Sequence, residues 1–208
     1  MSNLGSDEGD SKERTDRFPH TGPLRRAPAG AFLVIVRGPL GAGKSALSRR
    51  LAEELGGVVI SIDQILMDRD LGRWGSVYIT LDSFLTANRY AAEAVDRVLG
   101  NGRPAVVDGN FYWREAIDDL LRRIPCPSAT LTLDVGLEEC VARDALRVPS
   151  LGEEAARLVY AKVTSFDYGT RLDATPPLEN VVQAALGLLR DAGLLHRPPG
   201  RERPRLPT

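Results

Sequence analysis

Eight consecutive residues combine glycines, a lysine and a serine at a spacing that binds phosphate. Residues 38–45 read Gly-Pro-Leu-Gly-Ala-Gly-Lys-Ser and match G-x-x-x-x-G-K-[ST]. Glycines let the backbone curl so that its N–H groups surround phosphate oxygens, while Lys44 adds a point charge and Ser45 a hydroxyl for Mg²⁺. A glycine turn that happens to precede a helix is the alternative. The pattern predicts a nucleotide site that uses Gly38, Leu40, Gly41, Ala42, Gly43, Lys44, Ser45 and Ala46.

Carboxylates follow the next two apolar runs, where ligands of open α/β sheets bind. Asp108 comes after Ala105-Val106-Val107 and is expected to hold Mg²⁺ opposite Ser45. The alternative for Asp108 is a helix N-cap or a turn before Gly109. Asp63 ends the run 57–62 and could accept a proton from an attacking hydroxyl, or could be the N-cap of a helix over 64–73.

Two arginines, Arg143 and Arg147, lie four residues apart and therefore on one face of a predicted helix. Arginine can stack on adenine or grip phosphate with two hydrogen bonds. The alternative is a solvated helix face that also carries Glu139 and Asp144.

Alternating short apolar runs and amphipathic segments must position these residues. The runs predict strands over 31–36, 57–62, 105–107, 129–133 and 170–172. Helices are expected after the loop as far as Gly56-Gly57 and over 64–73, 81–99, 113–123, 137–147, 151–162 and 177–192. Such alternation predicts an α/β fold, a parallel sheet covered by helices on both faces.

Composition narrows the class of protein. The chain has 208 residues, of which 43% are hydrophobic and 26% charged. We expect a disordered leader over 1–28, one domain over 29–196 and a disordered basic tail over 197–208. Residues 30–195 contain 18 Lys and Arg against 22 Asp and Glu, a net charge of −4 that disfavours nucleic acid as a partner. His20 falls in the predicted leader and His196 at the very end of the predicted domain, so residues 30–195 contain no histidine base.

The location of the protein is also an expectation from the sequence. No apolar stretch approaches the ~20 residues of a membrane span, and the first residues do not resemble a secretory signal. The chain has only two cysteines, Cys126 and Cys140, and this low number suggests a reducing compartment. We therefore expect a cytoplasmic protein without a membrane partner, and leave its oligomeric state open.

The order of the segments resembles the P-loop kinases of small molecules and polynucleotides. This group includes adenylate, shikimate and gluconate kinases and the zeta toxin and polynucleotide kinase-like ATP-binding proteins. The resemblance covers residues 31–192 and rests on four segments: Gly-Pro-Leu-Gly-Ala-Gly-Lys-Ser, Val-Ile-Ser-Ile-Asp63, Ala-Val-Val-Asp108-Gly-Asn110 and Cys140-Val-Ala-Arg143-Asp-Ala-Leu-Arg147.

The resemblance implies a P-loop NTPase three-layer sandwich with a five-stranded sheet of order 2-3-1-4-5, a mobile lid, and ATP with Mg²⁺ as cofactors. It implies that Asp63 is the acceptor-side base, that Arg143 packs on adenine and that Arg147 reaches the phosphates. The expected acceptor contacts are Gln64, Arg69, Arg73, Arg89, Asn110 and Arg114. Aromatic residues nearby could stack on a planar acceptor or pack the core: Trp74, Tyr78, Phe111, Tyr112 and Trp113.

Three functions are compatible with these residues. The favoured one is transfer of the γ-phosphoryl group of ATP to a hydroxyl of a small molecule. A polynucleotide 5′-hydroxyl kinase is the second, although related polynucleotide kinases carry Asp-Asp-x-Arg where this chain has Asp63-Gln64-Ile65-Leu66. The third is a non-metabolic nucleotide-binding regulatory protein, which the lack of an Asn-Lys-x-Asp segment disfavours.

Overall fold

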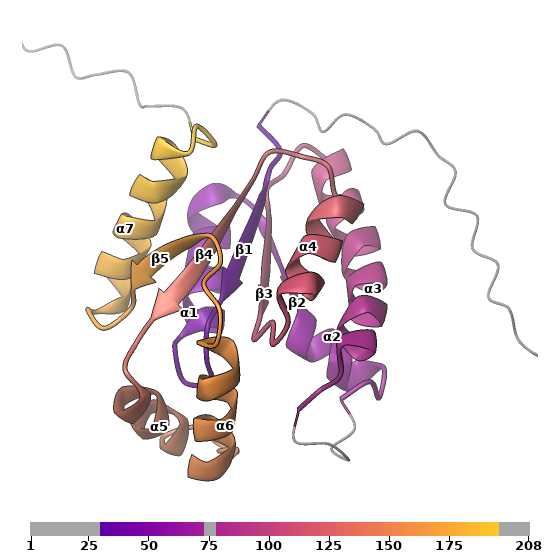
Figure 1. Cartoon of the computed structure of the whole chain (residues 1–208). Helices are drawn as coiled ribbons and strands as arrows, with labels where there is room; N and C mark the ends of the chain where they lie inside the picture. Colours follow the sequence, from indigo (N-terminus) through magenta and orange to yellow (C-terminus); the bar gives the residue numbers. More distant parts are fainter. Residues whose placement is uncertain (1–29, 73–77, 196–208) are drawn as a thin grey trace, which may run out of the picture.

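A five-stranded parallel sheet forms the centre of the molecule. The computed structural model describes residues 30–72 and 78–195. The strands lie in the order β2-β3-β1-β4-β5, and every neighbouring pair is parallel. This confirms the predicted α/β fold and strand order (Figure 1). The strands are β1 (Leu33–Arg37), β2 (Val58–Ser61), β3 (Ala105–Gly109), β4 (Ser128–Asp134) and β5 (Thr170–Asp173).

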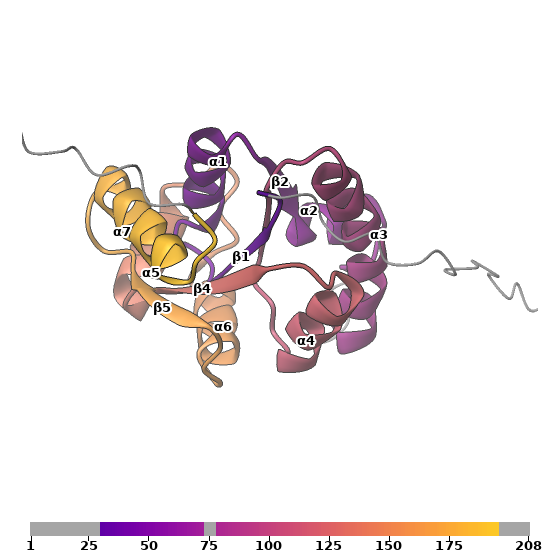
Figure 2. The ribbon, with the colours of Figure 1, turned by 90° about the horizontal axis from the view of Figure 1, so that it is seen from above.

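Helices cover both faces of the sheet because the strands are buried on both sides. Successive side chains of a strand point to opposite faces, so Leu33 and Ile35 pack with α2, α3, α4 and α6, whereas Val34 and Val36 pack with α1 and α7. The view along the sheet shows these layers (Figure 2). The helices are α1 (Lys44–Leu55), α2 (Ile62–Asp68), α3 (Leu81–Gly100), α4 (Arg114–Arg123), α5 (Leu137–Ala145), α6 (Glu153–Val163) and α7 (Leu178–Asp191).

Two boundaries near the predicted site differ from the expectation. The second strand ends at Ser61, and α2 begins at Ile62 and ends at Asp68, short of the predicted Arg73. The third strand continues through Gly109, so Asp108 lies inside it. Both differences move a predicted site residue from a loop into a regular element.

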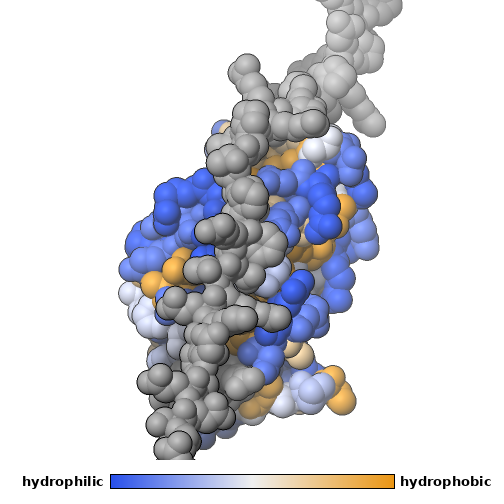
Figure 3. Space-filling view, turned by 90° about the vertical axis from the view of Figure 1, so that its right-hand side faces the viewer, coloured by the Kyte–Doolittle hydropathy of each residue, from blue (hydrophilic) through white to orange (hydrophobic). Residues whose placement is uncertain are grey.

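Helices α5 and α6 form a hairpin beside the carboxyl ends of the strands (Figure 1). The visible side of the molecule that carries α3 is mainly hydrophilic, with small separate apolar areas (Figure 3). Within residues 30–72 and 78–195, no helix is long and apolar enough to cross a membrane. The predicted leader, the predicted tail, Arg73 and Trp74 lie outside the described residues.

Candidate nucleotide and acceptor site

Two glycines in left-handed conformation shape the loop between β1 and α1. Gly41 has φ 80° and Gly43 has φ 92°, values that a residue with a Cβ rarely adopts. A Cβ on Gly41 would lie 2.1 Å from the carbonyl oxygen of Cys140 in α5, so the loop packs directly on that helix. Gly43 is the N-cap of α1 and offers no side-chain acceptor to the first turn. The N–H groups of that turn are therefore available to an anion.

Lys44 lies buried within the curve of the loop. Its Nζ atom donates to the carbonyl oxygen of Pro39 (3.0 Å) and to Oδ1 of Asn110 (2.8 Å). Burial lowers the pKa of Lys44, and the negative charges of Asp63 and Asp108 oppose that change. The ammonium group is thus held at the carboxyl end of β1, next to two carboxylates.

Asp108 has an unsatisfied carboxylate oxygen at the same edge of the sheet. It is buried on β3, the strand between β1 and β2, and its Oδ1 has no hydrogen-bond partner among the described residues. An unpaired, buried carboxylate oxygen fits a hard cation such as Mg²⁺, and the Ser45 hydroxyl on α1 is exposed at the loop. The helix-cap alternative for Asp108 is wrong, because β3 continues past it and the next helix begins at Arg114.

Asp63 lies in the first turn of α2 and does not cap that helix. The cap is Ser61, whose Oγ accepts a hydrogen bond from the N–H of Gln64 (3.4 Å). Asp63 Oδ1 instead accepts from the backbone N–H of Asn110 (3.3 Å). Burial raises the pKa of Asp63, while Lys44 lowers it. The N-cap alternative for Asp63 is therefore wrong, and a half-buried carboxylate faces the loop.

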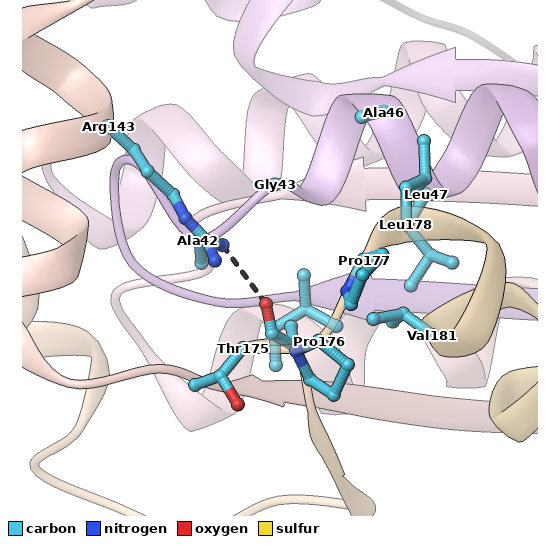
Figure 4. A pocket seen from close by; sticks show the side chains of 12 residues that line it. Ala42, Gly43, Ala46, Leu47, Arg143, Thr175, Pro176, Pro177, Leu178 and Val181 are labelled. Carbon is cyan, nitrogen blue, oxygen red and sulfur yellow. Dashed lines mark hydrogen bonds between the residues drawn. The ribbon is translucent and has the colours of Figure 1, made fainter.

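Arg143 forms one wall of a pocket of about 460 Å³ beside the loop. Its Nη1 donates to the carbonyl oxygen of Ala174 (3.0 Å), and its Nε pairs with Glu139 (2.7 Å). Figure 4 shows the guanidinium extended over Ala42 toward the segment between β5 and α7. The pocket is otherwise lined by Ala42, Gly43, Ala46, Leu47, Leu133, Ala174, Thr175, Pro176, Pro177, Leu178 and Val181.

The pocket is wide enough for a planar base and adjoins the phosphate loop through Ala42 and Gly43. Sequence reasoning missed the segment 174–178 as part of the site. Its position directly after β5, at the edge where ligands bind, was the signal that could have found it.

The turn between α5 and α6 is organised by Asp144. This residue is buried, and its Oδ2 accepts from Ser150 Oγ (2.8 Å) and from the N–H groups of Leu151 (3.1 Å) and Gly152 (3.3 Å). The expectation that Asp144 sits on a solvated face is therefore wrong. Its Oδ1 lies 3.5 Å from Arg147, an exposed side chain whose positive charge influences the pKa of both Lys44 and Asp63.

The predicted acceptor residues divide into two groups. Asn110 contacts both Lys44 and Asp63. Arg69 instead stacks on Tyr90 (3.9 Å), and Arg114 donates to the carbonyl oxygen of Asp167 (2.7 Å). Arg89 is exposed on α3, and within the described part of the chain it makes no hydrogen bond or ion pair.

Aromatic side chains pack beside Asp63. Phe111 is fully buried and stacks on Phe84 (6.3 Å between centroids), which supports the core-packing alternative for this residue. Tyr112 contacts Tyr78 edge to face at 6.0 Å, and its pKa is raised by burial and by the charge of Asp63. Tyr112 also hydrogen-bonds to the Asn110 side chain, so it lies next to Asp63.

Sequence reasoning also missed two cations that connect the end of α6 to its neighbours, Arg37 from the sheet and Lys162 to the start of α4. Arg37, at the end of β1, is fully buried and donates to the carbonyl oxygens of Val163 (2.6 Å) and Phe166 (3.4 Å). Burial and the charge of Arg114 lower the pKa of Arg37 to about 10, so it remains charged at neutral pH. Lys162 of α6 lies 3.5 Å from the centroid of the Trp113 ring.

A family model described as an AAA domain matches residues 33–165, well over half of the chain. A tRNA dimethylallyltransferase of Sorangium cellulosum (strain So ce56) is 37% identical over 121 residues, which is 49% of this chain and 38% of that protein. An uncharacterized protein of Mycobacterium tuberculosis (strain ATCC 25618 / H37Rv) is 33% identical over 175 residues, or 77% of this chain and 35% of that protein. The chain thus spans just over a third of the length of these relatives.

Solved structures with the same fold include several kinases. A sugar kinase from Janibacter sp. HTCC2649 superposes with a TM-score of 0.65 at 20% identity, over 80% of this chain and 99% of that chain. The APS kinase CysC of Mycobacterium tuberculosis, in complex with AMPPNP and APS, gives 0.62 at 15% identity, over 77% and 98%. A gluconokinase from Sinorhizobium meliloti 1021 gives 0.59 at 21% identity, over 81% and 96%. At these identities the likeness shows a P-loop kinase-like fold.

Proposed function

The chain belongs to the AAA domain family, and from that premise we propose that it is an ATP-dependent kinase that phosphorylates a hydroxyl of a small molecule. One observation carries the proposal. Lys44 of the phosphate loop and Asp63 of α2 both hydrogen-bond to Asn110, so a phosphate-binding cation and a candidate base face the same point in space. Phosphoryl transfer is accelerated by a cation that stabilises the transferred group and by a residue that orients the attacking hydroxyl.

Each side of the site would hold one substrate. On the donor side, the loop N–H groups and Lys44 would bind the phosphates of ATP, while the pocket beside Arg143 would take the adenine. Ser45 and Asp108 would hold Mg²⁺, which neutralises phosphate charge when bound. On the acceptor side, Asp63 would orient the hydroxyl, with Tyr112 bordering it.

The transfer itself forms one bond and breaks one. The acceptor oxygen bonds to the γ-phosphorus as the bond from that phosphorus to the β–γ bridging oxygen breaks, and ADP leaves. Lys44, and Arg147 from the turn between α5 and α6, would stabilise charge on the transferred group. Asp63 would accept the hydroxyl proton late, because alcohols lose it only as the new bond forms.

A second candidate is the transfer of a dimethylallyl group to tRNA. The observation that favours it is the 37% identity to a tRNA dimethylallyltransferase over 49% of this chain. The net charge of −4 over residues 30–195 opposes it, because RNA-binding surfaces are normally basic. The same charge opposes a polynucleotide 5′-hydroxyl kinase.

The test is an ADP-release screen of the full chain with Mg²⁺, ATP and a panel of small hydroxyl compounds. A second arm uses a 5′-hydroxyl oligonucleotide with the same readout. A third arm uses tRNA with dimethylallyl diphosphate and measures attachment of the dimethylallyl group to the tRNA, because that transfer releases diphosphate and no ADP. We expect turnover with a small hydroxyl compound, and a loss of ~10³-fold or more in Lys44→Met, because the transferred group loses its charge clamp. Unchanged turnover in that variant would contradict the proposal. ATP binding without turnover in any arm would favour a regulatory nucleotide-binding protein.

A further inference from the structure

Asn110 is the one residue at the site that hydrogen-bonds to both Lys44 and Asp63 within residues 30–72 and 78–195. It follows β3 directly, and its Oδ1 accepts from Lys44 Nζ at 2.8 Å. Its backbone N–H donates to Asp63 Oδ1 at 3.3 Å. The asparagine therefore stands between an ammonium group and a carboxylate that attract one another.

That attraction does not produce an ion pair. Each of the two charges influences the pKa of the other, yet no nitrogen–oxygen distance of 4.0 Å or less joins Lys44 to Asp63. Lys44 is buried and Asp63 is half-buried, so water screens their attraction only weakly. The contacts of Asn110 with both groups offer a reason why they stay apart.

The backbone around Asn110 is fixed firmly enough to do this. A Cβ on Gly109 would lie 3.0 Å from the Cβ of Ile62, so β3 approaches α2 closely. On the other side, Phe111 has φ 46° and is fully buried against Phe84. Asn110 is held between these two packed positions and cannot move away without disturbing the core.

We propose that Asn110 is a positioning residue that prevents Lys44 and Asp63 from forming a salt bridge. The proposal rests on the proposed function, since it explains how both groups stay available for catalysis. A direct pair would occupy the ammonium that must bind phosphate and would remove basicity from the carboxylate that must accept a proton. A neutral amide at position 110 satisfies Lys44 without adding charge.

The charged and titratable groups around Asp63 come from several elements. They are Lys44 of α1, Asp108 of β3, Arg147 after α5 and Tyr112 before α4. Of these, Lys44 and Tyr112 both hydrogen-bond to the Asn110 side chain. Truncation of Asn110 frees both groups, but of the two only Lys44 is positively charged and can form a salt bridge with Asp63.

The test is a carboxyl ¹³C NMR titration of the full chain without nucleotide, with the Asp63 signal assigned by its loss in Asp63→Asn. In Asn110→Ala the backbone N–H to Asp63 remains, but Lys44 can reach the carboxylate. We expect the Asp63 midpoint to fall by ~1 pH unit or more, the usual effect of a new opposite charge nearby. Asn101→Ala, an exposed site at the end of α3, is the matched control and should leave the midpoint unchanged.

A double-mutant comparison separates pairing from the entry of water. Asn110→Ala in a Lys44→Met background should leave the midpoint where Lys44→Met alone puts it. The same fall without Lys44, or no fall with Lys44 present, would overturn the proposal. If Asn110→Ala melts too low to titrate, Asn110→Ser is used, and the same fall is expected.

ATP binding gives an independent readout. Because Lys44 would have to leave Asp63 before binding phosphate, the Kd for ATP–Mg²⁺ should rise ~10-fold in Asn110→Ala for each unit that the Asp63 midpoint falls. An unchanged Kd alongside a shifted midpoint would overturn the proposal. Neither measurement uses phosphotransfer, so a negative result here is distinct from failure of the proposed kinase activity.

Discussion

The contact between Gly41 and α5 gives a prediction whose size follows from the structure. In Gly41→Ala, the new Cβ would lie 2.1 Å from the Cys140 carbonyl oxygen, well over 1 Å inside a normal contact. The obstacle is helix backbone, which cannot rotate aside. The φ of 80° adds the strain of a left-handed alanine. Left-handed strain costs ~1–2 kcal/mol and overpacking ~1–3 kcal/mol, so unfolding free energy should drop by ~2–5 kcal/mol.

Gly56→Ala is the matched control for strain alone. Gly56 has φ 61° at the C-cap of α1, and nothing lies within 4 Å of a Cβ there. We expect a loss of ~1–2 kcal/mol from strain in this variant. Alanine restricts the unfolded chain equally in both variants, so that contribution cancels in the comparison.

Urea unfolding of the two variants measures the difference, and calorimetric titration with ATP–Mg²⁺ measures its effect on the loop. Gly41→Ala should bind ATP ~10-fold or more weakly, because the loop can relieve the overlap only by moving its N–H groups. Gly56→Ala, at the far end of α1, should bind ATP normally. Equal destabilisation in the two variants would refute the inferred contact between the loop and α5.

Two further predictions concern Asp63 and Arg37. Asp63→Asn should lower turnover by ~10²-fold or more. In kcat–pH profiles, the wild-type rate should fall at acid pH as Asp63 takes up a proton, and the variant should show no such fall. Burial raises the pKa of Asp63 in the folded protein above its ordinary value of 3.8. Between these two pKa values the folded state binds more protons than the unfolded state, so the free energy of unfolding falls as pH rises from 3.8 through the folded-state pKa. Asp63→Asn should therefore melt at or above the wild-type temperature at pH 7, and lower melting there would contradict this. Arg37→Met leaves the carbonyls of Val163 and Phe166 unpaired and should cost ~2 kcal/mol or more in urea unfolding. Arg50→Met, at a partly exposed arginine that pairs with Glu53 and Glu179 on the surface, should have far less effect. Equal effects would show that Arg37 does not anchor the end of α6.

The strand segments and the phosphate loop could be predicted because local sequence determines them, whereas the strand order was implied by the resemblance to P-loop kinases. Apolar runs such as 31–36 have one environment in which they are stable, a sheet buried on both faces. The spacing of glycines in 38–45 encodes backbone conformation directly, and Gly41 and Gly43 indeed have positive φ. The sequence also indicated that Asp63 and Asp108 meet at one edge, because parallel strands share their carboxyl ends.

The partners of each polar side chain were decided only by the tertiary structure. Asp63 and Ser61 are equally good helix caps by residue type, and the approach of Asn110 decided which of them caps α2. Arg114 also lies between β3 and the body of α4, where acceptor contacts were expected, yet its side chain donates to the carbonyl oxygen of Asp167. The sequence pattern places Asp144 on a surface, but in the structure the turn at 150–152 covers it and donates hydrogen bonds to it. A one-dimensional pattern specifies which face of an element is apolar, but hydrogen-bond partners depend on distances of a few tenths of an ångström between segments far apart in the chain.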